Sequence, residues 1–96
     1  MNGDPTDGFD VEAVVAGLER FGGSALERRT VGRCVSDLAD SGRYAEDAGI
    51  ELTPDHVLDQ LADAPDGGPA DRWNWWIGSL EAAYGGYTAF QVRRFG

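Results

Sequence analysis

The chain has 96 residues and carries 17 Asp and Glu against 8 Lys and Arg, which gives a formal net charge of −9 at pH 7. A chain of this length is expected to fold as one domain with one core. No stretch approaches the roughly 18 consecutive apolar residues of a membrane-spanning helix, and the single cysteine, Cys34, excludes an internal disulfide or a Cys-rich zinc site within one chain.

The N-terminal segment 1–9 is rich in Gly, Pro, Asp and Asn, and we expect it to be a flexible lead-in. It has neither the positive nor the apolar region of a secretory signal. Asp10 is suited to cap a helix, and the first helix is predicted over 10–20. The apolar residues of this helix recur at helical spacing: Val11, Val14, Val15 and Leu18.

Ser24 and Glu27 have the spacing of a capping box, in which the serine accepts from the backbone of residue 27 and the glutamate reaches back. A second helix is therefore predicted to begin at Ser24 and to end or bend at Gly42. Its expected core stripe is Leu26, Thr30, Val31, Cys34, Val35 and Leu38.

A short helical turn is predicted over 44–48 and is closed by Gly49. Ile50 and Leu52, which follow the glycine, are expected to return to the core.

The clearest local signal is Thr53-Pro54-Asp55, where a capping residue precedes a proline suited to the first helical position and an acid that favours the positive end of the helix dipole. The third long helix is predicted over 53–64, and Pro65 stops it. Its expected core residues are Val57, Leu58 and Leu61.

The stretch 71–95 holds all three tryptophans, and we expect the fold to be organised around it. Asp71 is predicted to cap a helix that has one broad apolar stripe. That stripe consists of Trp73, Trp76, Ile77, Leu80, Ala83 and Tyr84. Trp75 points roughly 160° away from Trp73 on a helical wheel and lies with Ser79 and Ala82 on the opposite side. The helix is therefore either central in the domain or also faces a partner.

Residues 87–95 follow the Gly85-Gly86 pair and suit two structures. Thr88 and Gln91 repeat the capping-box spacing, which favours a short last helix with Arg93 and Arg94 at its negative end. The alternative is an edge strand, because Tyr, Thr, Phe and Val are good strand formers. The predicted fold is thus mainly α: a compact single domain over 10–96, with four or five short helices and a C-terminal segment that is a helix or an edge strand.

Residues that could carry chemistry are few. His56 has Asp55 and Asp59 beside it, but two or three weak ligands on one helix do not define a metal site. Cys34 lies in an apolar stripe, which favours a buried structural thiol over a nucleophile. The paired glycines lack the lysine and the spacing of phosphate-binding loops. We therefore expect no enzyme activity, no catalytic residue, no cofactor and no metal.

The segment 44–50 and the helix after it have an Ala-x-x-x-Gly spacing, Ala45 to Gly49, with apolar flanks. This pattern resembles the helix-turn-helix of DNA-binding proteins, and the resemblance implies a small transcriptional regulator. The sequence departs from the family in its longer turn and in Asp55, Asp59 and Asp63 on the helix that would read DNA. These carboxylates oppose the attraction to phosphate that dominates DNA affinity.

Besides the net negative charge, the types of charged residue are unusual. All eight cations are arginine, and aspartate outnumbers glutamate eleven to six. This composition resembles that of cytoplasmic proteins of extreme halophiles, in which carboxylates hold a hydrated surface and salt screens their repulsion. We therefore expect a salt-adapted cytoplasmic protein.

These observations favour a non-catalytic module that self-associates or docks a protein partner. The expected partner is a second copy or another protein, with no membrane and with nucleic acid less favoured. The predicted interface consists of Trp75, Ser79, Ala82, Tyr87, Phe90, Arg93 and Arg94. The alternative function is the small helix-turn-helix DNA-binding regulator.

Overall fold

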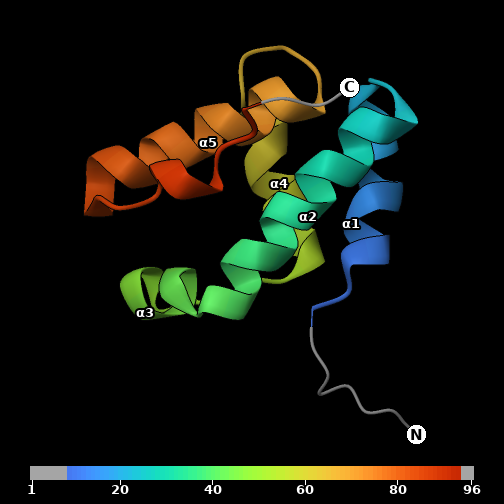
Figure 1. Cartoon of the computed structure of the whole chain (residues 1–96). Helices are drawn as coiled ribbons and strands as arrows, with labels where there is room; N and C mark the ends of the chain where they lie inside the picture. The colour runs from blue at the N-terminus through green and yellow to red at the C-terminus, as the bar shows by residue number, and fades with distance from the viewer. Residues whose placement is uncertain (1–8, 94–96) are drawn as a thin grey trace, which may run out of the picture.

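The computed structural model describes residues 9–93 of the chain, and all structural statements below concern those residues. The elements follow one another in this order: α1 (Val11–Gly17), η2 (Leu18–Phe21), α2 (Ala25–Ser41), α3 (Arg43–Ala48), α4 (Pro54–Ala62), α5 (Pro69–Tyr84) and η3 (Thr88–Phe90) (Figure 1). Here η2 and η3 are 3₁₀ turns. The mainly α fold is confirmed. The described part of residues 87–95 contains a single 3₁₀ turn, and neither the predicted short last α-helix nor an edge strand is found there.

Three of the predicted helix caps are formed. The side chains of Asp10, Ser24 and Thr53 each accept a hydrogen bond from the backbone N–H three residues further on, at 3.1, 3.0 and 3.1 Å. Gly42 and Gly49 end α2 and α3 in the left-handed conformation, with φ of 71° and 72°. The caps depend on residues close together in the chain, which is why the sequence predicts them.

Two helices, α1 and α5, each pack against both α2 and α4 (Figure 1). The close approach of α1 to α2 depends on Gly32, because a Cβ at this position would lie 2.7 Å from Cγ2 of Val15. Gly17 plays the same part where α1 meets α4, since a Cβ there would collide with Leu58. These two glycines are packing residues, and the sequence analysis did not identify them.

The core is apolar and centred on α5. Its largest fully buried side chains are Trp73 and Tyr87, and no charged residue of the described chain is buried. Val57, Leu58 and Leu61 of α4 are buried as predicted. None of the described helices is long and apolar enough to cross a membrane.

Some predicted core positions are wrong. Leu26, Ile50 and Tyr84 are 47%, 50% and 46% exposed, and Ala83 is exposed too. Leu26 lies in the first turn of α2 and Tyr84 is the last residue of α5. An apolar stripe is buried only along the length that neighbouring helices cover, and helical periodicity does not reveal that length.

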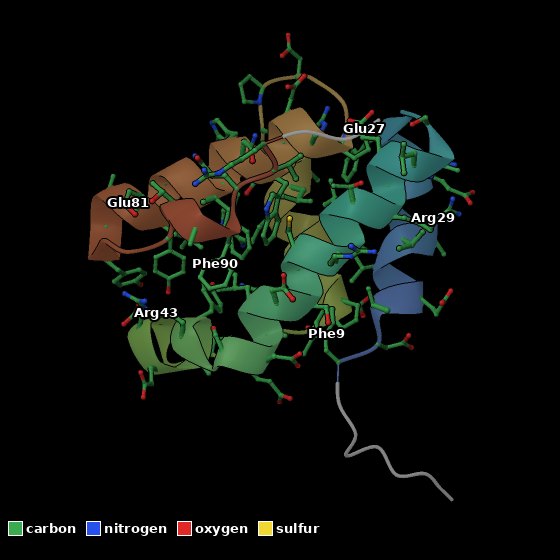
Figure 2. The ribbon with its side chains drawn as sticks, viewed as in Figure 1. Phe9, Glu27, Arg29, Arg43, Glu81 and Phe90 are labelled. Atoms are coloured by element: carbon green, nitrogen blue, oxygen red, sulfur yellow. The ribbon has the colours of Figure 1, made fainter. Side chains whose placement is uncertain are left out.

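The start of α5 also differs from the prediction. Asp71 was expected to cap this helix, but α5 begins at Pro69 and its N-cap residue, Gly68, has no side chain to offer. Glu27 of α2 supplies the missing acceptor, because its Oε2 accepts from the backbone N–H of Ala70 at 2.9 Å. Figure 2 shows Glu27 at this junction between α2 and α5. The carboxylate is therefore used between helices, where the sequence predicted a local capping box.

Phe9 corrects the predicted extent of the N-terminal lead-in. Its side chain is half-buried and packs against the core, and its carbonyl accepts from the backbone N–H of Val11 at 3.1 Å. Residues 1–8 of the predicted lead-in lie outside the described part of the chain.

Candidate interaction surface

Four consecutive residues of α5, Trp73-Asn74-Trp75-Trp76, point in different directions. Trp73 and Trp76 are buried and meet edge to face, with their ring centroids 5.6 Å apart. The Trp76 ring also packs 5.3 Å from that of Tyr44 on α3. Trp73 uses its polar atom as well, since Nε1 donates to the carbonyl of Phe90 at 2.8 Å. These two tryptophans therefore serve the core.

Asn74 holds the C-terminal segment of the chain. Residues 85–92, which we call the strap, run back along α5 (Figure 1). The amide of Asn74 donates to the carbonyl of Val92 at 2.9 Å and accepts from its N–H at 2.8 Å. The backbone N–H and C=O of Val92 are thus both hydrogen-bonded to the side chain of Asn74.

Tyr87 anchors the strap. Its side chain is fully buried, and its hydroxyl donates to Oδ2 of Asp47 on α3 at 2.7 Å. Glu81 accepts from the backbone N–H of Tyr87 at 2.6 Å and from that of Thr88 at 3.2 Å. Arg43 lies over the Tyr87 ring, 5.4 Å from its centroid, and donates to the carbonyl of Gly85 at 3.1 Å. Figure 2 shows Arg43 reaching from α3 toward the strap.

One residue in the C-terminal part of the predicted interface, Tyr87, is therefore corrected. Tyr87 is a core residue, because the strap folds back and inserts it between α3 and α5. Phe90 is half-buried and packs against the core, whereas Arg93 is exposed. Arg94 lies outside the described residues.

The other part of the predicted interface lies on the surface. Trp75 is 41% exposed, and Gly78, Ser79 and Ala82 are exposed beside it at the i, i+3, i+4 and i+7 positions of one helical face. We call these four residues the Trp75 face. It has no charged side chain, and the Ser79 hydroxyl donates to the Trp75 carbonyl at 3.3 Å within the helix.

Gly78 is the residue of this face that was not among the predicted interface residues. Glycine in a helix interior costs up to about 1 kcal/mol relative to alanine. A Cβ added at Gly78 meets no atom within 4 Å, in contrast to Gly32 and Gly17. Nothing in the described fold therefore requires glycine at this position.

His56 and Cys34 have structural surroundings. The hydroxyl of Tyr44 and Nε2 of His56 are hydrogen-bonded at 2.8 Å, and the two rings pack 5.5 Å apart. Burial, with a smaller effect from the Asp37 carboxylate, raises the pKa of the Cys34 thiol, which holds it in its unreactive protonated form. Across residues 9–93, no three His, Cys, Asp or Glu side chains gather as they would around a metal ion.

The helix that would read DNA presents acids to the solvent. Asp55, Asp59 and Asp63, at or just beyond α4, are all exposed. Arg28 of α2 donates to the carbonyls of Gly22 and Gly23 at 3.1 and 2.6 Å. The three exposed carboxylates oppose the attraction of this helix to a phosphate backbone.

An open groove of about 630 Å³ lies where Phe9, the end of α2, α3 and the segment before α4 meet. Buried Leu38 and Leu52 line it together with exposed Asp40 and Glu51. It has no cationic side chain in its lining and was not predicted from the sequence.

Comparison with curated proteins and with solved structures found no match. A family model described as the WNWW domain matches residues 1–81. Its description repeats the four residues 73–76, whose separate roles are set out above. Because the match covers most of the sequence, the chain belongs to the WNWW domain family.

Proposed function

We propose that this protein is a non-catalytic self-association module and that the Trp75 face is its contact surface. The observation that carries the proposal is the exposure of Trp75 beside a glycine that the fold does not require. Exposed aromatic residues contribute disproportionately when a partner covers them. Gly78, Ser79 and Ala82 are small enough for the backbone of a second helix to approach closely.

The net charge of the chain also favours the Trp75 face as the contact surface. Two copies that each carry a net charge of −9 repel one another, so their contact is most favourable where neither presents a carboxylate. The four residues of the Trp75 face carry no carboxylate, and salt that screens the nearby charges, including exposed Asp71 one turn before Trp75, should strengthen the contact.

We further propose that the module works in a salt-rich cytoplasm. The support is the composition alone: eight arginines, no lysine, and an excess of aspartate over glutamate. A surface of this kind stays hydrated at high ionic strength, where self-repulsion is screened.

The alternative of a helix-turn-helix DNA-binding regulator has weaker support. Asp55, Asp59 and Asp63 are exposed where a reading helix needs neutral or basic residues. A gel shift on random DNA at moderate and high salt tests it, and a salt-sensitive shifted band would favour the DNA-binding alternative.

The direct test of the proposed function is Trp75→Glu, which places a carboxylate at the centre of the face. Light scattering at molar KCl should show an associated wild type and a monomeric variant, with helix content by circular dichroism retained. Leu26→Glu is the matched control, since Leu26 is a similarly exposed apolar residue on α2. A wild type that is monomeric at all concentrations and salts, or equal loss of association in both variants, would refute the proposal.

A further inference from the structure

We propose that α3 and α5 form a peptide-binding cradle, filled here by the strap of the same chain, and that this cradle also accepts the strap of a second copy. The cradle consists of Arg43, Asp47, Trp73, Asn74 and Glu81. This inference rests on the proposed function, because both concern self-association. The cradle lies on a different side of α5 from the Trp75 face, and the segment that it binds is the strap of the second copy.

The cradle recognises the strap through backbone groups. Asn74 binds both polar groups of Val92, Trp73 binds the carbonyl of Phe90, and Glu81 binds the N–H groups of Tyr87 and Thr88. Hydrogen bonds to backbone groups, combined with selected side chains held in pockets, are a recurring way in which domains bind peptide ligands. The contacts between the strap and the cradle are thus of the kind that a peptide ligand makes with its binding domain.

Side-chain specificity comes from the anchors. Tyr87 is fully buried with its hydroxyl on Asp47, while Phe90 and Val92 pack against the edge of the core. The chemistry that fits is thus a tyrosine followed three residues later by phenylalanine and five residues later by valine. A second copy of this chain supplies that pattern with the same geometry.

The connection between cradle and strap is suited to opening. Gly85 and Gly86 have φ of 81° and 83°, a region that glycine enters without strain. A Cβ at Gly85 would meet no atom within 4 Å, whereas one at Gly86 would collide with the Arg43 guanidinium, so Gly85 is the freer of the two. The family match ends at residue 81, so it includes the five cradle residues and stops before the strap. The match therefore covers the cradle and does not extend over the strap.

Exchange between copies costs few contacts. A strap from a second copy would make the same hydrogen bonds, so the two forms differ mainly in the effective concentration of the tethered strap, on the order of millimolar for a short flexible connection. Exchange should therefore become prominent when the strap is weakened in one copy and the cradle in the other.

This prediction leads to a complementation experiment with full-length chains. Asn74→Ala removes both hydrogen bonds of the cradle to Val92 and leaves the strap intact. Val92→Pro removes the N–H that donates to the Asn74 side chain and leaves the cradle intact. The preceding residue, Gln91, already has φ −71° and ψ 151°, which proline allows. Both chains also carry Trp75→Glu, so that the Trp75 face does not contribute.

The two chains, one of them isotopically labelled, are mixed and observed by native mass spectrometry. We expect the mixed dimer to exceed the random proportion by on the order of tenfold, because only the mixed pair contains an intact strap in an intact cradle. The control mixes the Asn74→Ala chain with a chain that carries both substitutions, which leaves no intact pair. Phe90→Ala replaces Val92→Pro as the strap variant if the proline chain loses its helix content.

Random pairing, or no dimer from folded chains, would overturn the exchange. That result would leave the Trp75 face untouched, because the background already lacks it. Conversely, a mixed dimer in this background would support the cradle even if wild-type association did not depend on Trp75.

Discussion

Glu27 of α2 caps α5 from a distance of 43 residues in the sequence, with its Oε2 2.9 Å from the backbone nitrogen of Ala70. The Ser24 side chain caps α2 locally, so the two members of the predicted capping box serve different helices. This bond joins the starts of the two longest helices.

Glu27→Ala should lower the free energy of unfolding by about 1–2 kcal/mol, because it leaves the first turn of α5 without its acceptor. Urea titration measures the change. Glu46→Ala is a suitable control, since Glu46 is exposed on α3 and should stay within about 0.5 kcal/mol of wild type. If the two variants were equally stable, Glu27 would not be a cap for α5.

The two helical glycines Gly32 and Gly78 should respond to alanine with opposite signs. Gly32→Ala forces α1 and α2 apart at Val15 and should cost about 1–3 kcal/mol despite the gain in helix propensity. Gly78→Ala meets no atom of the chain and should stabilise the monomer by about 0.5–1 kcal/mol. Thermal unfolding of dilute protein checks both, and a destabilised Gly78→Ala monomer would show that this position is packed.

The buried tyrosine of the strap should make the fold sensitive to alkali. Burial is the main cause that raises the pKa of Tyr87, and its hydrogen bond to the Asp47 carboxylate raises it further. The stability from this group is complete below the unfolded pKa of about 10, and it is lost as the pH rises through the folded value. The free energy of unfolding should therefore fall above about pH 10.

Tyr87→Phe gives the comparison. The variant should be less stable at neutral pH by about 1 kcal/mol because it lacks the hydroxyl bond, and its stability should fall less steeply in alkali. Denaturant titrations at neutral and alkaline pH show how steeply the free energy of unfolding falls with pH in the wild type and in the variant. Identical slopes would mean that another group accounts for the alkaline loss.

Salt should stabilise the fold, because the chain carries nine more negative than positive charges. The screening length falls from about 10 Å at 0.1 M to about 3 Å at 1 M, so repulsion among carboxylates weakens over this range. The melting temperature should rise with KCl. Asp59→Asn with Asp63→Asn should raise it at low salt and reduce its salt dependence, since both residues are exposed. A salt-independent melting temperature would refute the halophile interpretation.

The sequence predicts those features of the fold that depend on neighbours in the chain. The caps at Asp10, Ser24 and Thr53 and the glycine ends of α2 and α3 belong to this group. Helical periodicity also predicts correctly that Trp73 and Trp75 lie on opposite sides of α5, because the angle between them is fixed within one helix.

Features that depend on how helices meet were not predicted. The packing roles of Gly32 and Gly17 require the position of α1, and the cap from Glu27 requires that α2 and α5 begin side by side. The burial of Tyr87 depends on the strap folding back onto α5, which no local pattern specifies. For the same reason the sequence placed Tyr87 on the interface.

Coverage of Trp75 by a second molecule can be measured through tryptophan fluorescence. Trp73 is fully buried and Trp76 nearly so, which leaves Trp75 as the exposed tryptophan among the three. Acrylamide quenching at molar KCl should therefore report Trp75, and the quenchable fraction should fall as protein concentration rises through the range where light scattering shows association. A quenchable fraction that stays constant while the molecule associates would show that the contact lies away from Trp75.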